Sequence, residues 1–547
     1  MLRKLRIALA LVAFAVLTFF FLDFSRLLPE SVQVIAKIQF VPALISLSLG
    51  IILLLLLLTL VFGRIYCSVI CPLGIYQDVI SRLANLFRKK KLRYKFRKAK
   101  TILRWLVLTL VIITYLSGLG LVLDLLDPYS MYGRMAVHLF KPVYMAANNG
   151  LELLFTAFNN YTFYKVDIHF GGWASFGLAL ISLLVVSVLA WRFGRTWCNT
   201  ICPVGTVLGF LSKLSVFKLS IDHETCNQCG LCSFNCKATC IDSKKGSIDY
   251  SRCVACFNCM ESCNKKGVKY LPFWKVKKTG TDKTQVKTVS GKIQAKTKTK
   301  TKTKKRIETD TDTKIEVKTI NKTKTDASKR EFLSVLMMSS LLMPKALAAG
   351  FRQQISSLRP LKRTVPMMPP GAGDRARFNS LCTSCHLCVS KCPGDVLQPS
   401  LLEYGVEGIM QPQMLFDKGF CNYDCTLCTE VCPSGALKTL TKEEKHRTQT
   451  GRVVFVLENC IVYRNETHCG ACSEHCPTQA LRMVPYKGHL TIPEPHPDIC
   501  IGCGGCEFIC PVRPYKAVFV EGYEIQQVAK AFEDEEKQDI VLDDFGF

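Results

Sequence analysis

Four cysteines near the end of the chain have the spacing that holds a metal cluster: Cys500, Cys503, Cys506 and Cys510, the last followed by Pro511. Three thiolates on one tight loop, with a fourth that ligates a neighbouring cluster, are typical of bacterial ferredoxins with 4Fe-4S clusters. A zinc site usually takes its ligands as two separated pairs, and disulfide frameworks belong mainly to short secreted chains. The spacing therefore predicts an iron-sulfur cluster.

Similar runs occur five more times, twice in the middle of the chain and three times after residue 350. The six runs comprise Cys226, Cys229, Cys232 and Cys236; Cys253, Cys256, Cys259 and Cys263; Cys382, Cys385, Cys388 and Cys392; Cys421, Cys425, Cys428 and Cys432; Cys460, Cys469, Cys472 and Cys476; and the run that begins at Cys500. These cysteines suit six 4Fe-4S clusters, two from the first pair of runs and four from the last four.

The pairing of the runs follows from the rule that the fourth cysteine usually serves the neighbouring cluster. Cys263 is expected to complete the first cluster and Cys236 the second. In the last four runs, neighbours can pair, or the first can pair with the fourth and the second with the third. Cys240 is left over, and a buried free thiol is favoured over an alternative ligand. The histidines within the runs are expected to lie beside ligands or to be exposed: His386, His468 and His475.

The first half of the chain contains an internal duplication that ends in a shorter cysteine motif. The pattern Gly-Arg-x2-Cys-x3-Cys-Pro-x-Gly occurs at residues 63–74 and again at residues 194–205. If the two copies pack about a pseudo-twofold axis, they bring four thiols into one shared site: Cys67, Cys71, Cys198 and Cys202. The alternative is two structural or redox-active dithiols, which a cytosolic location allows but does not favour.

Composition places part of the chain in a membrane. The chain has 547 residues, of which 49% are hydrophobic, and is long enough for several domains. Four apolar segments approach the roughly 20 residues that a bilayer needs, at residues 7–22, 41–62, 102–123 and 173–191. The basic residues before the first segment and the basic cluster at residues 88–98 predict that both ends of this four-helix bundle are cytoplasmic.

The expected fold is an α-helical membrane bundle with four transmembrane helices, followed by small α+β ferredoxin-like polycluster domains. Its expected parts are a membrane domain at residues 1–215, a two-cluster ferredoxin at 216–274, a disordered Lys/Thr-rich linker at 275–327, a twin-arginine-like signal or membrane anchor at 328–350, and a four-cluster polyferredoxin at 351–547. Much of the net charge of +28 lies in the linker and the basic cluster, and the linker is nearly devoid of aromatic residues. Nucleic acid is therefore not an expected partner.

The segment from Ser328 resembles a twin-arginine export signal, with Lys329-Arg330 before a short apolar core and small residues after it. Because clusters are inserted in the cytoplasm, the export route would have to carry folded protein. This predicts a cytoplasmic first ferredoxin and a periplasmic last domain. The alternative is an interfacial helix, with the last domain left in the cytoplasm.

Polar residues in or beside the loop between the third and fourth expected spans could shape a quinol site, because quinol oxidation needs a proton acceptor near the membrane surface. They are Asp124, Asp127, Tyr129, Arg134, His138 and His169. The alternative is that they are solvated loop groups. No histidine lies in any of the four expected spans, which argues against haem held within the bundle.

Together these motifs resemble two protein families. Residues 1 to about 270 are similar to the NapH/MauN-type membrane ferredoxins, and residues from about 328 onward to the NapG/MauM-type periplasmic ferredoxins. The two are usually separate proteins that form a quinol dehydrogenase. The resemblance implies a multi-pass protein of the bacterial inner membrane that oxidises quinol from the membrane pool. Electrons would pass through the clusters to a periplasmic reductase, such as nitrate reductase, or to a cytochrome.

A second function stays open, because related membrane polyferredoxins with the same paired motifs look like assembly, maturation or regulatory factors for metalloenzymes. The chain has no nucleotide-binding glycine loop and no hydrolytic triad, and no residue is assigned a catalytic role. Since the hydrocarbon core is about 30 Å thick and no haem is expected in it, quinone diffusion or a partner subunit is expected to link the two sets of clusters.

Overall fold

A computed structural model describes residues 1–24, 27–87, 94–168, 171–275, 359–360 and 363–530. The candidate residue His169, the expected export signal and almost all of the expected linker lie outside these residues. The chain divides into two units: residues 1–276 and 359–547 form the first, and residues 277–358 form the second. The described residues therefore belong to the first unit.

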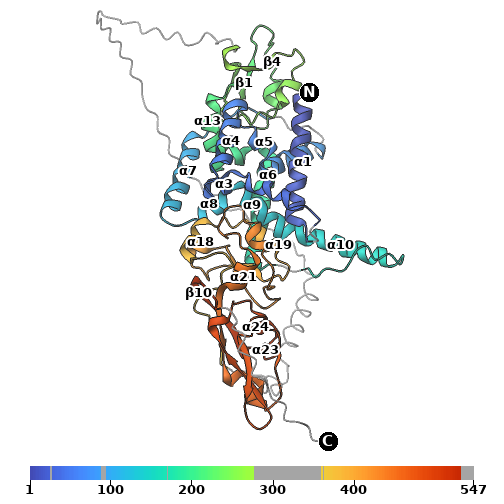
Figure 1. The fold of residues 1–547 in the computed structure, drawn as a ribbon. Coiled ribbons are helices and arrows are strands. Elements are labelled where there is room, and N and C mark those ends of the chain that lie inside the picture. Colours follow the sequence, from blue (N-terminus) through green and yellow to red (C-terminus); the bar gives the residue numbers. More distant parts are fainter. Residues whose placement is uncertain (25–26, 88–93, 169–170, 276–358, 361–362, 531–547) are drawn as a thin grey trace, which may run out of the picture. The chain divides into compact units, whose positions relative to one another are not determined.

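Helices make up the chain before its first iron-sulfur segment (Figure 1). They are α1 (Leu2–Leu22), η1 (Glu30–Gln33), α2 (Val34–Lys37), α3 (Phe40–Ile45), α4 (Leu49–Phe62), α5 (Tyr66–Val69), α6 (Pro72–Leu86), α7 (Thr101–Leu116), α8 (Leu121–Leu126), α9 (Pro128–Met135), the π-helix η2 (Ala136–Phe140), α10 (Lys141–Thr156), α11 (Trp173–Phe193), α12 (Thr196–Thr200), α13 (Pro203–Leu211) and η3 (Ser212–Leu214). Proline begins α6, α9 and α13, where its missing N–H leaves no hydrogen bond unmade.

Two of these helices, α1 and α11, have 21 residues each and are apolar enough to cross a membrane. The second expected span is interrupted between α3 and α4, where Leu47 has a φ of 52°. The third expected span ends early, because the chain turns at Gly118, with a φ of 87°, between α7 and α8. Among the described residues, α4 and α7 are shorter apolar helices, so the four-span bundle stays a prediction.

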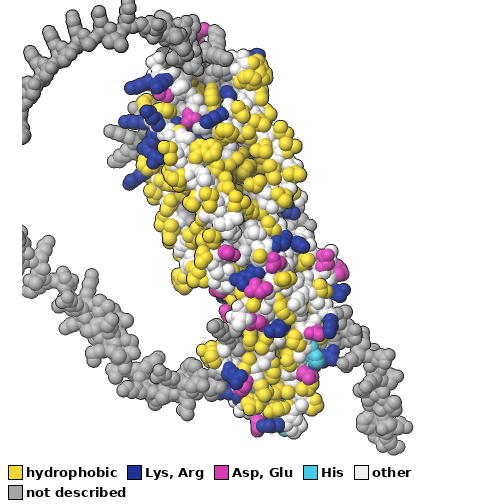
Figure 2. Space-filling view, turned by 90° about the vertical axis from the view of Figure 1, so that its left-hand side faces the viewer, with side chains coloured by type: hydrophobic (Ala, Val, Ile, Leu, Met, Phe, Trp, Pro, Cys, Tyr) yellow, Lys and Arg dark blue, Asp and Glu magenta, His cyan; other side chains and the backbone are white. Residues whose placement is uncertain are grey.

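The surface of α4 and α7 is nevertheless strongly apolar. Leu49 and Leu53 of α4 and Ile102 and Leu116 of α7 expose more than half of their surface. Figure 2 shows a broad and mostly hydrophobic surface over the helical part of the molecule. Contiguous apolar surface of this kind marks a region that contacts a membrane or a partner.

The first iron-sulfur segment follows the helices as a small α+β fold. Strand β1 (Phe217–Ile221) pairs antiparallel with β4 (Val268–Pro272), and β2 (Ile241–Asp242) pairs with β3 (Ser247–Ile248). Two short helices, α14 (Leu231–Phe234) and α15 (Asn258–Glu261), each lie within a cysteine run, and η4 (Phe273–Lys275) ends the segment. Each half of this fold therefore supplies one cysteine loop to a shared core.

The last segment repeats this construction with longer insertions. Its antiparallel strand pairs are β5 (Leu397–Pro399) with β6 (Pro412–Met414), β7 (Thr448–Phe455) with β10 (Val518–Val528), and β8 (Leu481–Pro485) with β9 (Thr491–Pro495). Its helices are α18 (Arg375–Leu381), α19 (Leu387–Lys391), η5 (Val406–Gly408), α20 (Leu427–Glu430), α21 (Lys442–Arg447), η6 (Leu457–Asn459), α22 (Ile461–Asn465), α23 (Ala471–Glu474), η7 (Pro497–Ile499) and α24 (Gly505–Ile509). As expected, the two segments are small α+β folds built around cysteine loops.

A buried carboxylate joins the helices to the first iron-sulfur segment. Asp78 of α6 accepts hydrogen bonds from Arg195 at 2.8 Å and Arg6 at 3.1 Å, and Lys237 lies at 3.6 Å. All four side chains are buried. Burial alone would raise the pKa of Asp78, but the three cations hold it below its ordinary value. One carboxylate thus balances charges from three separate parts of the chain.

We expect Asp78→Asn to destabilise the protein, because it leaves three buried cations without their counter-charge. The cost of removing one partner of such a buried network is about 3–5 kcal/mol. Thermal unfolding of the detergent-purified protein measures this as a lower midpoint. Asp222→Asn is the matched control: its ion pair with Lys269 is at the surface, at 3.0 Å, and should contribute less than about 1 kcal/mol. Equal midpoints for the two variants would contradict the assignment.

Candidate functional site

The duplicated motif brings its four cysteines together. Each motif forms a short helix, α5 or α12, and the second cysteine of each motif caps the next helix. All four cysteines are buried, and the thiol of Cys71 interacts electrostatically with those of Cys67, Cys198 and Cys202. The structure therefore places the four thiols around one region, which we call the four-thiol site.

The arginine of each motif reaches across to the other copy. Arg64 donates to the carbonyl oxygen of Cys198 at 3.3 Å, and Arg195 donates to that of Cys67 at 2.7 Å. Both guanidinium groups are fully buried. These reciprocal hydrogen bonds are what the expected pseudo-twofold packing requires, and they hold the two cysteine turns face to face.

The last glycine of each motif is required by close packing. A Cβ atom at Gly74 would lie 2.3 Å from the carbonyl oxygen of Cys67, and one at Gly205 would lie 2.2 Å from that of Cys198. Any larger residue would push the cysteine turn away from the helix that follows it. The sequence motifs did not predict the roles of these arginines and glycines. Their presence at the same positions in both copies of the repeat was the pattern that could have indicated them.

Cysteines of the first iron-sulfur segment form two sets. A cavity of about 730 Å³, part of it open solvent, is lined by Cys226, Cys229, Cys232 and Cys263. The thiols of Cys236, Cys253, Cys256 and Cys259 interact electrostatically with one another. Cys240 is also buried, with its sulfur 3.5 Å from that of Cys236. These two sets match the exchange of fourth cysteines that the spacing predicts, with Cys263 near the first run and Cys236 near the second.

In the last segment, the fourth cysteine of each run lies near the first three cysteines of the neighbouring run. Electrostatic contacts group Cys382, Cys385 and Cys388 with Cys432, and Cys421, Cys425 and Cys428 with Cys392. They also group Cys460, Cys469 and Cys472 with Cys510, and Cys500, Cys503 and Cys506 with Cys476. Of the two pairings that the spacing allowed, the fold favours the pairing of neighbours.

The spacing of the thiols suits a cluster better than a single ion. In the described residues, no group of three or more His, Cys, Asp or Glu side chains converges closely enough to share one metal ion. A zinc ion would draw four sulfurs to about 2.3 Å, whereas a four-iron cluster holds its cysteine ligands farther apart. Sets of four thiols that lie near one another without converging on a single point fit the larger group.

The residues between the third and fourth expected spans pack directly against the first cysteine run of the last segment. Ser384 donates to the Asp124 carboxylate at 2.8 Å, and its carbonyl oxygen accepts from Arg134 at 3.2 Å. His138 contacts His386, with 2.6 Å between Nε2 and Nδ1. A Cβ atom at Gly133 would lie 2.4 Å from the carbonyl oxygen of Cys385, so this glycine allows the close approach.

These residues are buried rather than solvated, which changes their chemistry. Burial raises the pKa of Asp124 to about 7 despite the hydrogen bond from Ser384, and it lowers the pKa of His138 to about 4. Asp127 caps α9 by accepting from the backbone N–H of Ser130 at 2.8 Å. Tyr129 is buried near Cys385. The alternative of solvated loop groups is therefore wrong for these described residues.

The histidines within the cysteine runs differ in their surroundings. His386 is buried, whereas His468 and His475 are exposed. The ring of His468 lies 4.8 Å from that of His489, and the His475 ring is bonded to the carbonyl oxygen of Ala471 at 3.0 Å. A role beside the ligands is therefore open to His386, the histidine that contacts His138.

Comparison with known proteins matches four stretches of the chain to three iron-sulfur families. Residues 45–95 and 176–222 match a 4Fe-4S binding domain, and residues 381–437 and 467–513 each match a 4Fe-4S dicluster domain. The first match contains both copies of the duplicated motif, and the other two contain most cysteines of the last segment. Binding of 4Fe-4S clusters is thus confirmed for the chain.

Curated relatives match parts of the chain. The putative electron transport protein YccM of Escherichia coli (strain K12) is 26% identical over 38% of this chain, which spans about half (51%) of that relative. The ferredoxin-type protein NapG of the same strain is 28% identical over 34% of this chain and 83% of its own length. No solved structure matches the chain.

A third relative is similar enough to show the family. The methylamine utilization ferredoxin-type protein MauM of Methylorubrum extorquens is 32% identical over 26% of this chain and 67% of its own length. With the cysteine sets of the last segment and the dicluster matches, this similarity shows that the chain belongs to the ferredoxin-type protein family.

Proposed function

We propose that the protein spans a bacterial inner membrane, oxidises quinol, and passes the electrons through 4Fe-4S clusters to a periplasmic reductase or cytochrome. The observation that carries this proposal is that the two iron-sulfur segments contact opposite ends of the same apolar helices. At the start of α1, Arg3 pairs with Glu261, and just after its end Asp23 pairs with Lys391 at 3.1 Å.

Helix α11 is contacted in the same way. Near its start, the Ser175 hydroxyl lies 3.6 Å from the Met410 sulfur, and just after its end the Arg195 N–H donates to the carbonyl oxygen of Lys237 at 3.0 Å. Because α1 and α11 have the length that a bilayer needs, these contacts support one iron-sulfur segment on each side of the membrane. The basic start of the chain supports a cytoplasmic position for the first segment.

The cysteine sets define the proposed electron path. The chain has 29 cysteines, and the six runs with the four-thiol site use all of them except Cys240. When bound, a 4Fe-4S cluster accepts and releases one electron at a time. The six runs would hold six clusters, and the four-thiol site would hold a seventh between the two iron-sulfur segments.

Buried residues between the sets support a continuous path. Tyr66 lies near Cys71 of the four-thiol site and near Asp127, and Tyr129 lies near Asp127 and Cys385. In the last segment, the backbone N–H of Cys421 donates to the carbonyl oxygen of Cys503 at 2.9 Å, which joins its two halves. Buried aromatic rings and cysteine loops thus connect the four-thiol site to the far end of the last segment.

Electron paramagnetic resonance of the anaerobically purified protein tests quinol oxidation. We expect menadiol to produce reduced-cluster signals, because two electrons leave each quinol for the chain while its two protons pass to water. Dithionite gives the signal of full reduction as a control. Signals from dithionite but none from menadiol would refute quinol oxidation by this chain and favour the assembly-factor alternative.

The iron content of the protein tests whether the four-thiol site holds a cluster. The double variant Cys67→Ser, Cys198→Ser should contain about four fewer iron atoms per chain, because it removes one cysteine from each copy of the motif. Iron and acid-labile sulfide analysis measures this loss. Asp222→Asn, whose ion pair with Lys269 at 3.0 Å lies at the surface, is the control and should keep the full iron content. An unchanged iron content in the double variant would contradict the proposed seventh cluster.

The orientation is tested with epitope tags at the two ends of the chain. Protease added to intact spheroplasts should remove a tag placed after Phe547 and leave a tag placed before Met1. Permeabilised cells, in which both tags are accessible, provide the control. A C-terminal tag that survives in intact spheroplasts would place the last segment in the cytoplasm.

A further inference from the structure

The contact between His138 and His386 fixes the tautomers of both rings. His386 Nε2 lies 2.7 Å from the carbonyl oxygen of Met410, and a carbonyl oxygen can only accept. His386 Nε2 therefore carries the proton, and its Nδ1 is an acceptor. Since that Nδ1 lies 2.6 Å from His138 Nε2, the latter must donate. The network thus leaves His138 Nδ1 as a lone-pair acceptor.

That acceptor edge of His138 is directed away from the histidine pair. A Cβ atom at Gly171 would lie 3.1 Å from Cε1 and 3.3 Å from Nδ1 of His138. No hydrogen bond reaches His138 Nδ1 from the residues that the structure describes. The low pKa of His138, caused by burial and by the nearby Arg134 and Lys141, keeps the ring neutral and the lone pair available at neutral pH.

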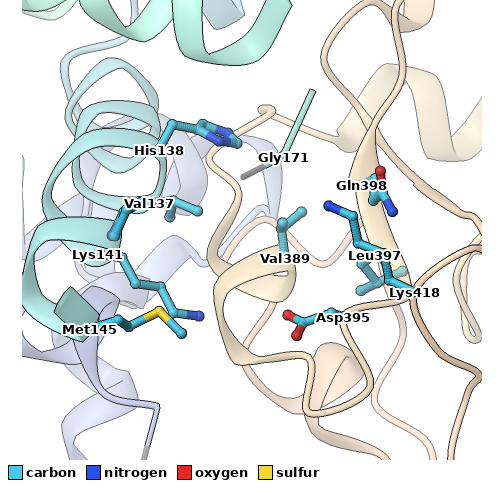
Figure 3. Close-up of a pocket in the computed structure, with 11 residues that line it drawn as sticks. Val137, His138, Lys141, Met145, Gly171, Val389, Asp395, Leu397, Gln398 and Lys418 are labelled. Atoms are coloured by element: carbon cyan, nitrogen blue, oxygen red, sulfur yellow. The ribbon is translucent and has the colours of Figure 1, made fainter. Parts of the chain in front are cut away.

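Beside this edge lies a pocket between the helices and the last segment (Figure 3). It contains about 510 Å³ of space, part of it open to solvent. Val137, Met145, Val389 and Leu397 form apolar parts of its wall, and Asp395, Gln398 and Lys418 line it as well. In Figure 3 the Lys141 side chain extends toward the same space. A pocket that combines apolar walls with a few placed polar groups is typical of a site for a small organic ligand.

Lys141 supplies donors at a second point of the pocket. Its ammonium group donates to the carbonyl oxygen of Ser390 at 2.6 Å, which fixes its position. An ammonium group has three protons, so two are left for an oxygen atom of a ligand. The pocket therefore offers an acceptor at His138 and donors at Lys141.

The position of the pocket suits a lipid-soluble redox ligand. Helix α1 ends at Leu22 and α11 begins at Trp173, two residues after Gly171, so the pocket lies at one end of both membrane-length helices. Val143, Leu153 and Leu154 of the adjoining α10 are exposed and apolar. Val389 of the pocket wall directly follows Cys388 of the first cysteine run in the last segment.

We propose that this pocket binds the head group of a quinol, with one hydroxyl donating to His138 Nδ1 and the other oxygen accepting from Lys141. The inference rests on the proposed quinol oxidation and assigns its site. Oxidation breaks both O–H bonds of the quinol: two electrons would leave one at a time for the 4Fe-4S cluster that the cysteine set with Cys385 and Cys388 would hold, and two protons leave. The first proton goes to His138 Nδ1 and then to water at the open side of the pocket, and the second goes to water there directly.

Two independent variants test the site, so that the test does not depend on a single substitution. Gly171→Ala places a methyl group against His138 Nδ1 while it keeps both histidines, and Gly171 has no positive φ that alanine would strain. His138→Phe removes the acceptor and keeps a ring of similar size. Gly177→Ala, which has open space at the Cβ position, and His489→Phe, at an exposed site outside the pocket, are the matched controls.

Anaerobic equilibrium dialysis with menadiol measures binding, and electron paramagnetic resonance measures reduction. Loss of one hydrogen bond should weaken menadiol binding about tenfold in Gly171→Ala and His138→Phe. The rate of cluster reduction at low menadiol should fall by a similar factor, while dithionite-reduced signals and iron content stay unchanged. The two control variants should match the unmodified protein in every measurement.

The outcomes separate this site from quinol oxidation itself. If menadiol reduces the unmodified protein and both pocket variants equally well, the site is wrong and the proposed function stands. If menadiol fails to reduce the unmodified protein, the proposed function fails; dialysis then decides the site, because binding that survives in both pocket variants overturns it. Loss of dithionite-reduced signals in one variant would assign a structural role to that residue, and the other variant would then carry the test.

Discussion

Gathering four thiols in a buried place is the constraint on which the rest of the structure depends. Buried thiolates repel one another and lose their hydration, so they are stable together only when a metal cluster neutralises them. Each loop must also turn tightly enough to present three sulfurs to one side. Left-handed residues within the runs provide these turns, with positive φ at Gln228, Phe257, Ser384 and His386. Short helices then follow, and paired strands close each core.

Buried ionic contacts decide how these cores attach to the helices. Asp78 forms ion pairs with Arg6, Arg195 and Lys237, which come from three separate parts of the chain. At the other end of α1, Lys391 forms an ion pair with Asp23. Such pairs contribute little net stability compared with apolar packing, but a misplaced partner leaves a buried charge alone. They therefore specify one arrangement of helices and iron-sulfur segments rather than many.

The cysteine spacing alone predicted the iron-sulfur class, the small α+β folds and the candidate ligands. It could not choose between the two pairings of the last four runs, because that choice depends on how β7 and β10 bring distant loops together. Apolar length predicted α1 and α11 well. Two other expected spans are interrupted or end early, because hydropathy does not register the backbone turns at Leu47 and Gly118, and whether they cross a membrane stays a prediction.

The candidate quinol residues show a different limit of sequence reasoning. Asp124, Arg134 and His138 were recognisable as polar groups beside an apolar segment, but their partners, Ser384 and His386, lie about 250 residues later in the chain. A contact over such a distance leaves no local pattern. The expectation that a partner or quinone diffusion links the two sets of clusters stays a prediction, and the four-thiol site lies among the helices between them.

The contacts between the helices and the last segment also bear on how the protein is made. Residues on the two sides of the 277–358 unit meet through Asp23 and Lys391, Phe21 and Ser390, and His138 and His386. None of these contacts includes a residue of that unit. A chain cut within it would keep them, and the peptide connection would act by raising the effective concentration of one half near the other. Fused and split forms of such a protein can therefore share one interface, and the two differ in assembly rate and stoichiometry.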